Sequence, residues 1–122
     1  MGFLGNNMAA DIHLKIEETG HTKIVRLQGK VDAVSTPILE KRLQPLLDSE
    51  HTFLVDFSKV EYLSSAGMRF LLSATRKMKA KEGMIAFFGI NEEVSEIIKM
   101  AGFEKILTIF PNEATALNSI NQ

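Results

Sequence analysis

Two hydrophobic periods alternate along the chain, and this alternation predicts a mixed α/β domain. Near the N-terminus, apolar and polar residues alternate one by one over 12–16 and again over 23–28, which is the period of half-buried strands. Residues 19–21 lie between them, contain a glycine and predict a hairpin turn. Two continuous apolar runs, 53–57 and 84–88, are typical of interior strands that are buried on both faces.

Between these strands the apolar residues recur every three or four positions, which is the period of an amphipathic helix. One helix is expected to begin with Thr36 as its N-cap and Pro37 at its first position. Pro45 is expected to break or kink that helix, because proline removes a hydrogen bond and clashes with the preceding turn. A second helix is expected to begin at the serine pair 64–65 and to end at Gly83.

Two more helices are expected after Asn91 and Asn112, on either side of a last strand at 106–110. This order of elements implies right-handed crossovers and a single mixed β-sheet of about five strands with about four helices. We expect the helices to cover one main face of the sheet. The predicted core comprises apolar residues of the interior strands and inner helix faces: Leu54, Val55, Leu71, Leu72, Ile85, Phe87, Val94, Ile97 and Ile98.

Composition narrows the possible functions. The chain has 122 residues, is 45% hydrophobic and 24% charged, and carries a net charge of −1. This balance gives no electrostatic basis for binding nucleic acid, and no apolar run approaches the ~20 residues that span a bilayer. The chain has no cysteine, and its three histidines are scattered, so we expect no metal and no cofactor. The lack of cysteine also suits a cytoplasmic protein. Residues 1–10 are expected to be unstructured, with Met8 as a candidate native start, and 11–122 to form the domain.

Two adjacent serines are the main candidates for chemistry. The apolar strand at 53–57 is expected to run into a short polar turn, after which Ser64 and Ser65 open the second helix. Unpaired N–H groups and the macrodipole at a helix N-terminus favour a phosphate there. No base or metal site is predicted nearby, so the hydroxyls suit modification better than nucleophilic attack. The simpler alternative is that both serines only cap the helix.

Three segments, in their order and spacing, resemble STAS domains. The signature lies in residues 56–68 (DFSKVEYLSSAGM), and it is supported by residues 27–32 (LQGKVD) and 101–106 (AGFEKI). The resemblance covers about residues 12 to 120, and it implies a single STAS-like α/β domain that acts as an anti-sigma factor antagonist.

The resemblance also implies a partner-switching mechanism. The unphosphorylated protein would bind an anti-sigma factor that is also a serine kinase of the histidine-kinase ATPase type. Phosphorylation of a serine would release the antagonist, and a PP2C-type phosphatase would reset it. The alternative within the fold is a STAS interaction module for a non-sigma target, such as a signalling enzyme, a secretion regulator or a lipid-transport complex.

The acceptor position departs from the family pattern. Many phosphorylated members read Asp-Ser-Ser-Gly, with the second serine as acceptor, and alignment on Gly67 puts Ala66 at that position. The acceptor is therefore either displaced or missing. If it is displaced, Ser65 is our first choice and Ser64 the second. Gly67 is expected to let a partner approach the helix closely. The implied partner-binding residues are Lys30, Asp32, Tyr62, Ser64, Ser65, Ala66, Gly67, Met68 and Arg69.

Other interpretations of these residues remain open or are weak. Asp32 could equally cap the turn before the first helix, and Met68 could belong to the core. A serine hydrolase would need a base and an oxyanion hole, and the chain lacks Gly-x-Ser-x-Gly, so no enzyme is predicted. A receiver domain would use Asp56 as acceptor, but it needs an acidic pair for magnesium and a late lysine that the pattern does not supply. We expect Asp56 and Ser58 to organise their turn instead.

Overall fold

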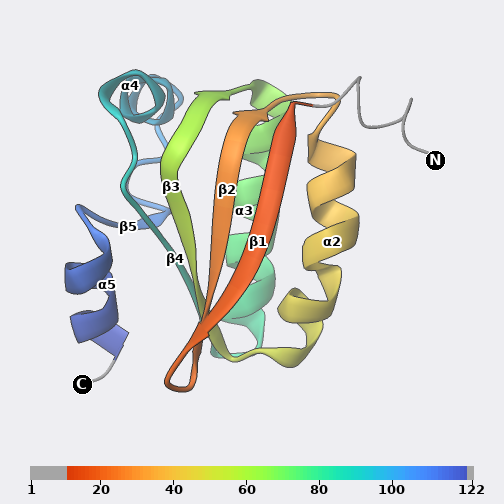
Figure 1. The fold of residues 1–122 in the computed structure, drawn as a ribbon. Coiled ribbons are helices and arrows are strands. Elements are labelled where there is room, and N and C mark those ends of the chain that lie inside the picture. The colour runs from red at the N-terminus through yellow and green to blue at the C-terminus, as the bar shows by residue number, and fades with distance from the viewer. Residues whose placement is uncertain (1–10, 121–122) are drawn as a thin grey trace.

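A five-stranded mixed sheet forms the centre of the protein in the computed structural model, which describes residues 11–120. The strands lie side by side in chain order: β1 (Ile12–Thr19), β2 (Thr22–Val31), β3 (Thr52–Leu63), β4 (Met84–Phe88) and β5 (Thr108–Phe110). β1 and β2 form an antiparallel hairpin, and the other neighbouring strands run parallel (Figure 1). This architecture confirms the predicted mixed sheet.

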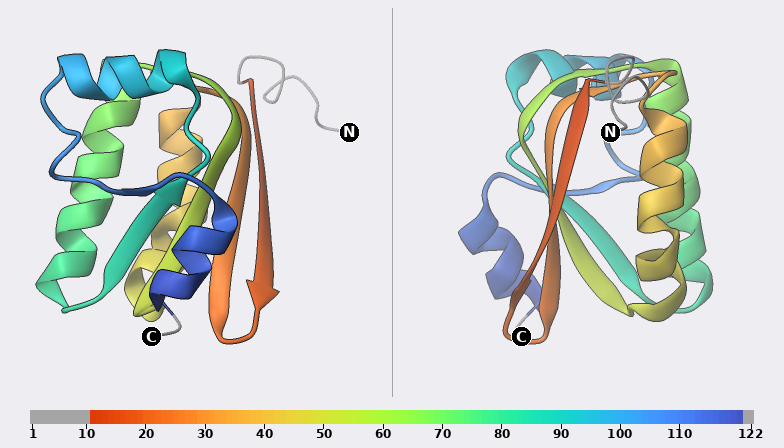
Figure 2. Two further views of the ribbon diagram at one scale, coloured as in Figure 1. Left: turned by 90° about the vertical axis from the view of Figure 1, so that its left-hand side faces the viewer. Right: turned by 45° about the vertical axis from the view of Figure 1, so that its right-hand side comes forward.

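Four helices in the described residues surround the sheet: α2 (Thr36–Ser49), α3 (Ser65–Ala80), α4 (Glu92–Met100) and α5 (Glu113–Ile120). α2 and α3 lie together over one face, and α5 lies on the opposite face (Figure 2). α4 crosses the end of the sheet where β3 finishes (Figure 1). The helices therefore cover both faces, and the expectation of one main covered face is wrong.

Two apolar layers explain why residues 53–55 of β3 and residues 84–88 of β4 are apolar at every position. Val55 packs in the large cluster under α2 and α3, whereas its neighbour Leu54 packs in a smaller cluster with Ala116 of α5. Successive side chains of a strand point to opposite faces, so a strand covered on both sides needs apolar residues throughout. Of the nine predicted core residues, eight are buried, and Ile97 is only half-buried at the edge of the large cluster.

β3 is longer than the sequence pattern predicts. It continues past Asp56 for seven residues to Leu63, where a polar turn was expected. The extension is held because residues 59–63 pair with the end of β2, from Gln28 opposite Lys59 to Val31 opposite Leu63. One irregularity in the register precedes this segment, between Arg26 and Gln28, and one lies within it, between Gly29 and Lys30. This pairing carries the chain to the far end of the sheet before α3 begins.

The first helix also differs from expectation at both points that were predicted. Its N-cap is Ser35, not Thr36, and no side-chain hydrogen bond caps it. Thr36 is the first helical residue, with its hydroxyl buried and without a hydrogen-bond partner in the described residues. α2 also continues through Pro45 without a break.

At the other end of the chain, β5 starts at Thr108, two residues later than predicted.

Candidate functional site

The carboxyl ends of β2, β3 and β4 meet at one end of the sheet, and this is where α/β folds usually place their binding sites. The backbone N–H of Ser64 donates to the carbonyl of Val31 at 2.9 Å and so ties the start of α3 to the end of β2. Asn91 caps α4 by accepting from the N–H of Val94 at 2.8 Å, and its amide donates to the carbonyl of Val60 at 2.9 Å. These bonds fix the starts of α3 and α4 to the strand ends, and the second half of α4 borders the serine pair through Ile97 and Ala101.

The two serines occupy different positions. Ser64 is the extended N-cap of α3, and its Oγ accepts from the backbone N–H of Gly67 at 3.2 Å. Ser64 is half-buried, whereas Ser65, the first residue of the helix, is exposed. Within residues 11–120 no hydrogen bond involves the Ser65 side chain. One serine therefore holds the helix start, and the next offers its hydroxyl to solvent.

Gly67 and Met68 do not lie on the surface, and the expectation that a partner approaches the helix at Gly67 is wrong. A Cβ at position 67 would lie 2.7 Å from both Cγ1 and the carbonyl oxygen of Val31, and 2.8 Å from Cδ1 of Leu63. Met68 is 3% exposed and belongs to the core. The glycine is therefore needed because α3 begins in direct contact with the strands beneath it.

Asp32 organises the loop between β2 and α2. Its Oδ1 accepts from the backbone N–H groups of Val34 and Ser35, both at 3.0 Å, and Ser35 Oγ in turn accepts from the N–H of Asp32 at 2.9 Å. The hydrogen bond from the Ser35 N–H is the main reason that the pKa of Asp32 lies below its usual value, against the opposing effect of burial. The geometry matches the capping interpretation of Asp32, and it leaves the apolar side chain of Val34 exposed beside the site.

Lys30 and Tyr62 are neighbours in the sheet, but they face away from the serines. They are paired in register, and both side chains are exposed. The residues that follow them, Val31 and Leu63, are buried in the cluster under α2 and α3. Because strand side chains alternate, Lys30 and Tyr62 point to the opposite face of the sheet. The predicted partner-binding residues are therefore divided between two faces of the molecule.

Two hollows flank the start of α3, with Arg69 bordering both. The α3–α4 hollow, of about 280 Å³, is lined by Ser64, Ser65, Met68, Arg69, Ile97, Ala101 and Phe103. The α2–α3 hollow, of about 340 Å³, is lined by Ala33, Thr36, Pro37, Glu40, Ala66, Arg69, Phe70 and Ser73. The apolar contribution of α4 and the segment after it was missed from the sequence, although the segment 101–106 had been singled out for its resemblance.

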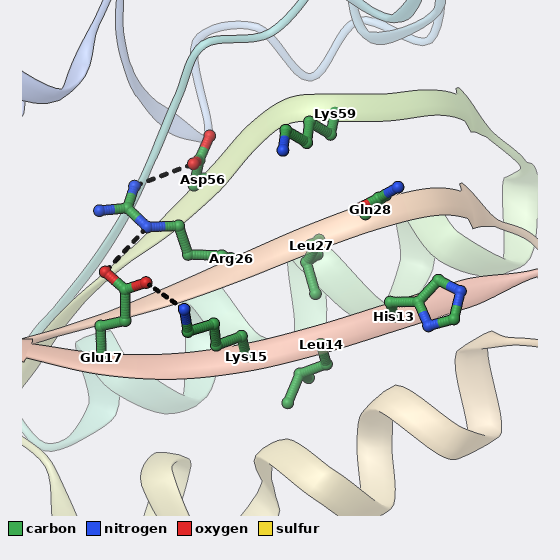
Figure 3. A pocket seen from close by; sticks show the side chains of 9 residues that line it. All are labelled: His13, Leu14, Lys15, Glu17, Arg26, Leu27, Gln28, Asp56 and Lys59. Atoms are coloured by element: carbon green, nitrogen blue, oxygen red, sulfur yellow. Dashed lines mark hydrogen bonds and ion pairs between the residues drawn. The ribbon is translucent and has the colours of Figure 1, made fainter.

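A third hollow lies on the other face of the sheet and is dominated by one arginine (Figure 3). Arg26 Nη1 donates to Asp56 Oδ2 at 2.9 Å and to Glu113 Oε1 at 2.7 Å, and its Nε donates to Glu17 Oε1 at 3.2 Å. The hydrogen bond with Glu113 is the largest of the contributions that raise the pKa of Arg26, while burial opposes them. One guanidinium therefore joins β1, β2, β3 and α5.

Asp56 has a structural role in this cluster. Burial alone would raise the pKa of its carboxyl, but hydrogen bonds from Ser58 and Arg26 outweigh burial and lower that pKa. Ser58 N–H donates to Asp56 Oδ1 at 2.8 Å, a local bond of the expected kind, although it lies within β3 and not in a turn. No group of acidic or histidine side chains in residues 11–120 could hold a metal ion. Asp56 therefore lacks the magnesium-binding neighbours that a receiver domain requires.

Comparison with known proteins identifies the family. The family model described as STAS domain matches residues 13–116. The chain belongs to the STAS domain family. This match extends over both flanks of the serine turn and over all five strands, from β1 to β5.

Relatives of this STAS domain are named as anti-sigma factor antagonists. The candidate anti-sigma factor antagonist BtrV of Bordetella bronchiseptica is 30% identical over 89 residues, which cover 72% of this chain and 74% of BtrV. The anti-sigma F factor antagonist of Paenibacillus polymyxa is 26% identical over 114 residues, 89% of this chain and 97% of its own. A crystal structure of an anti-sigma factor antagonist from Mycobacterium paratuberculosis has a TM-score of 0.83 at 25% identity, covering 91% of this chain and 95% of its own.

These relatives establish a class of activity. Anti-sigma factor antagonists are binding proteins and not enzymes, in agreement with the prediction that this chain is not an enzyme. Their binding targets, as a class, are anti-sigma factors. Each helix in the described part of this chain is too short or too polar to cross a membrane.

Proposed function

We propose that this STAS domain is the antagonist in a partner switch. In its unmodified form it binds an anti-sigma factor that is also a serine kinase, and phosphorylation of Ser65 releases it. A PP2C-type phosphatase restores the binding form, and the cycle takes place in the cytoplasm. The observation that carries this proposal is the exposed hydroxyl of Ser65 at the first position of α3, beside the α3–α4 hollow.

The contacts of the two serines favour Ser65 as the acceptor. Ser64 Oγ already accepts the N–H of Gly67, and its side chain is half-buried. A kinase would have to break this cap to reach the oxygen, and loss of a serine cap costs about 0.5–2 kcal/mol of stability. Ser65 has no such bond in residues 11–120, so its phosphorylation requires no local unfolding.

The charge of the phosphate explains release. A phosphoserine carries about −1.5 to −2 charges at neutral pH. Ser65 borders an apolar hollow formed with Ile97, Ala101 and Phe103, where an apolar side chain of a partner can insert. Burying a dianion against such an interface costs several kcal/mol, and each 1.4 kcal/mol lowers affinity tenfold. The modified protein therefore stays folded and loses its partner.

The binding surface consists of the Asp32–Val34 loop, Ser65, Ala66, Arg69 and the α3–α4 hollow. These parts are exposed or half-exposed. They lie on the face of the sheet that α2 and α3 cover, at the carboxyl end of the strands. Lys30 and Tyr62 form a second, smaller contact only if the partner wraps around this end, because their side chains point to the other face. Gly67 and Met68 act indirectly by seating α3.

A phosphorylation assay tests the acceptor. The partner is captured from the native cell, identified, and incubated as purified kinase with ATP and wild type, Ser64→Ala, Ser65→Ala or Ala66→Ser. Mass spectrometry should locate the label on Ser65 in wild type, and only Ser65→Ala should lose it. Label on Ser64 would contradict the assignment, and a captured partner without kinase activity would contradict the mechanism.

A constitutive STAS module for a non-sigma target is the second candidate, because Ala66 stands at the family's usual acceptor position. Position 66 is half-buried and lines the α2–α3 hollow, on the other side of Arg69 from Ser65. The Ala66→Ser variant separates the two functions. A kinase that labels Ala66→Ser but leaves wild type unlabelled would mean that this chain has lost its switch.

A further inference from the structure

Ser65 and Arg69 are placed to interact along α3. They are four residues apart, so their side chains lie on one face of the helix, one turn from each other. Both side chains are exposed, and both line the α3–α4 hollow. None of the ion pairs in residues 11–120 involves Arg69, in contrast to Arg26, which holds three carboxylates.

We propose that Arg69 binds the phosphate of phosphorylated Ser65 within the same molecule, and that this pair closes the α3–α4 hollow. The inference rests on the proposed function, and it adds that Arg69 holds the phosphate in place. In the kinase reaction the γ-phosphoryl group of ATP passes to Ser65 Oγ, the hydroxyl proton is lost and ADP leaves. The new phosphate oxygens then accept hydrogen bonds from the planar guanidinium of Arg69, whose N–H groups can bind a phosphate in a bidentate manner.

The position of the other cations on α3 makes Arg69 the specific partner. Arg76 follows Ser65 by 11 residues, which is about 16 Å along a helix and beyond the screening length of about 10 Å at 0.1 M salt. Lys77 is further along the helix and already pairs with Asp48 at 3.1 Å. Arg69 alone among the basic residues of α3 stands one turn from the acceptor.

This pair makes release more complete than an added negative charge alone. In the unmodified protein Arg69 presents a cation at the rim of the hollow, where a partner carboxylate can bind it. In the modified protein the same guanidinium is occupied by the phosphate, and the two side chains lie across the hollow. Phosphorylation thus removes a positive contact and blocks the apolar contact beside it.

The test measures the titration of the phosphate directly. Phosphoserine is incorporated at position 65 of the full chain during translation by amber suppression, and its phosphorus NMR signal is followed against pH at low salt. A nearby cation favours the dianion, so the midpoint in the wild-type background should lie about 0.2–0.4 pH unit below that of Arg69→Gln. Arg76→Gln, the matched control, should titrate as wild type does, and Arg69→Lys should restore part of the shift.

Two results would overturn the pair. Equal midpoints in wild type and Arg69→Gln would exclude it, whether both are normal or both are lowered by the helix N-terminus alone. If Arg76→Gln raised the midpoint of the phosphate as much as Arg69→Gln does, the effect would reflect the net charge of the protein and not a specific contact with Arg69. Because the phosphoserine is installed without a kinase, this measurement does not depend on the phosphorylation assay. A failed kinase assay with a shifted midpoint would reject the switch in the cell and keep the Arg69 contact.

Discussion

Gly67→Ala tests how closely the start of α3 is seated on the sheet. In an unobstructed helix this change stabilises the protein by about 1 kcal/mol, because alanine loses less conformational entropy than glycine. Here the new methyl group would lie 2.7 Å from Val31 Cγ1, 2.7 Å from the Val31 carbonyl oxygen and 2.8 Å from Leu63 Cδ1. The carbonyl also accepts the N–H of Ser64, so it cannot move aside without weakening that bond.

The expected magnitude follows from these contacts. Overpacking of this kind costs about 1–3 kcal/mol, and a weakened backbone hydrogen bond adds about 0.5–1.5 kcal/mol. After the favourable helix propensity of alanine is subtracted, Gly67→Ala should lower the free energy of unfolding by about 1–3 kcal/mol. In a domain of this size that corresponds to a fall of roughly 4–12 °C in Tm. Urea titration followed by circular dichroism measures the difference.

A double-mutant cycle locates the cause. Val31→Ala removes Cγ1 but keeps the carbonyl, so it should relieve part of the clash, and the two substitutions together should cost less than their sum. Gly67→Val, with a larger side chain, should cost more than Gly67→Ala. A Gly67→Ala protein as stable as wild type, or more stable, would refute the close approach and return Gly67 to the surface.

Three further predictions concern stability and use the same titration. Leu71→Ala should lower the free energy of unfolding by about 2–5 kcal/mol, and a loss under about 0.5 kcal/mol would place Leu71 outside the core. Ser64→Ala should cost about 0.5–2 kcal/mol and Ser65→Ala less than about 0.5 kcal/mol, so equal losses would contradict their division of roles. Arg26→Met should cost about 1–3 kcal/mol at pH 7, because it leaves Asp56 buried without its cation. The folded-state pKa of Asp56 is lowered, so this contribution exists above about pH 4 and disappears on further acidification; a loss that stays constant down to pH 3 would refute it.

Local patterns determined the elements of this protein and most of its core. Strand and helix periods depend on neighbouring residues alone, so the hairpin, the interior strand 84–88 and the cap at Asn91 could all be predicted. The serine turn was also visible, because a helix start is defined by a few consecutive residues. Eight of the nine predicted core residues are buried for the same reason, since an apolar face needs some partner surface whatever its identity.

Contacts between distant segments decided the rest. β3 runs to Leu63 because β2 offers it a pairing edge, and residues 58–63 alone carry too little apolar periodicity to predict a strand. Gly67 has the local properties of an exposed helix start, yet Val31 and Leu63 close over it. Which face of the sheet a helix covers is likewise a matter of the whole fold, as α5 illustrates.

The site combines both kinds of information. The sequence alone placed Ser65 at the start of a helix, because the hydroxyl and the helix start are properties of one short segment. It could not join Arg26 to Asp56 and Glu113, which are 30 and 87 positions away, nor bring Ile97 and Phe103 beside the serine. Those neighbours are set by the crossovers of the chain, and no local propensity encodes the distance between segments that meet only after folding.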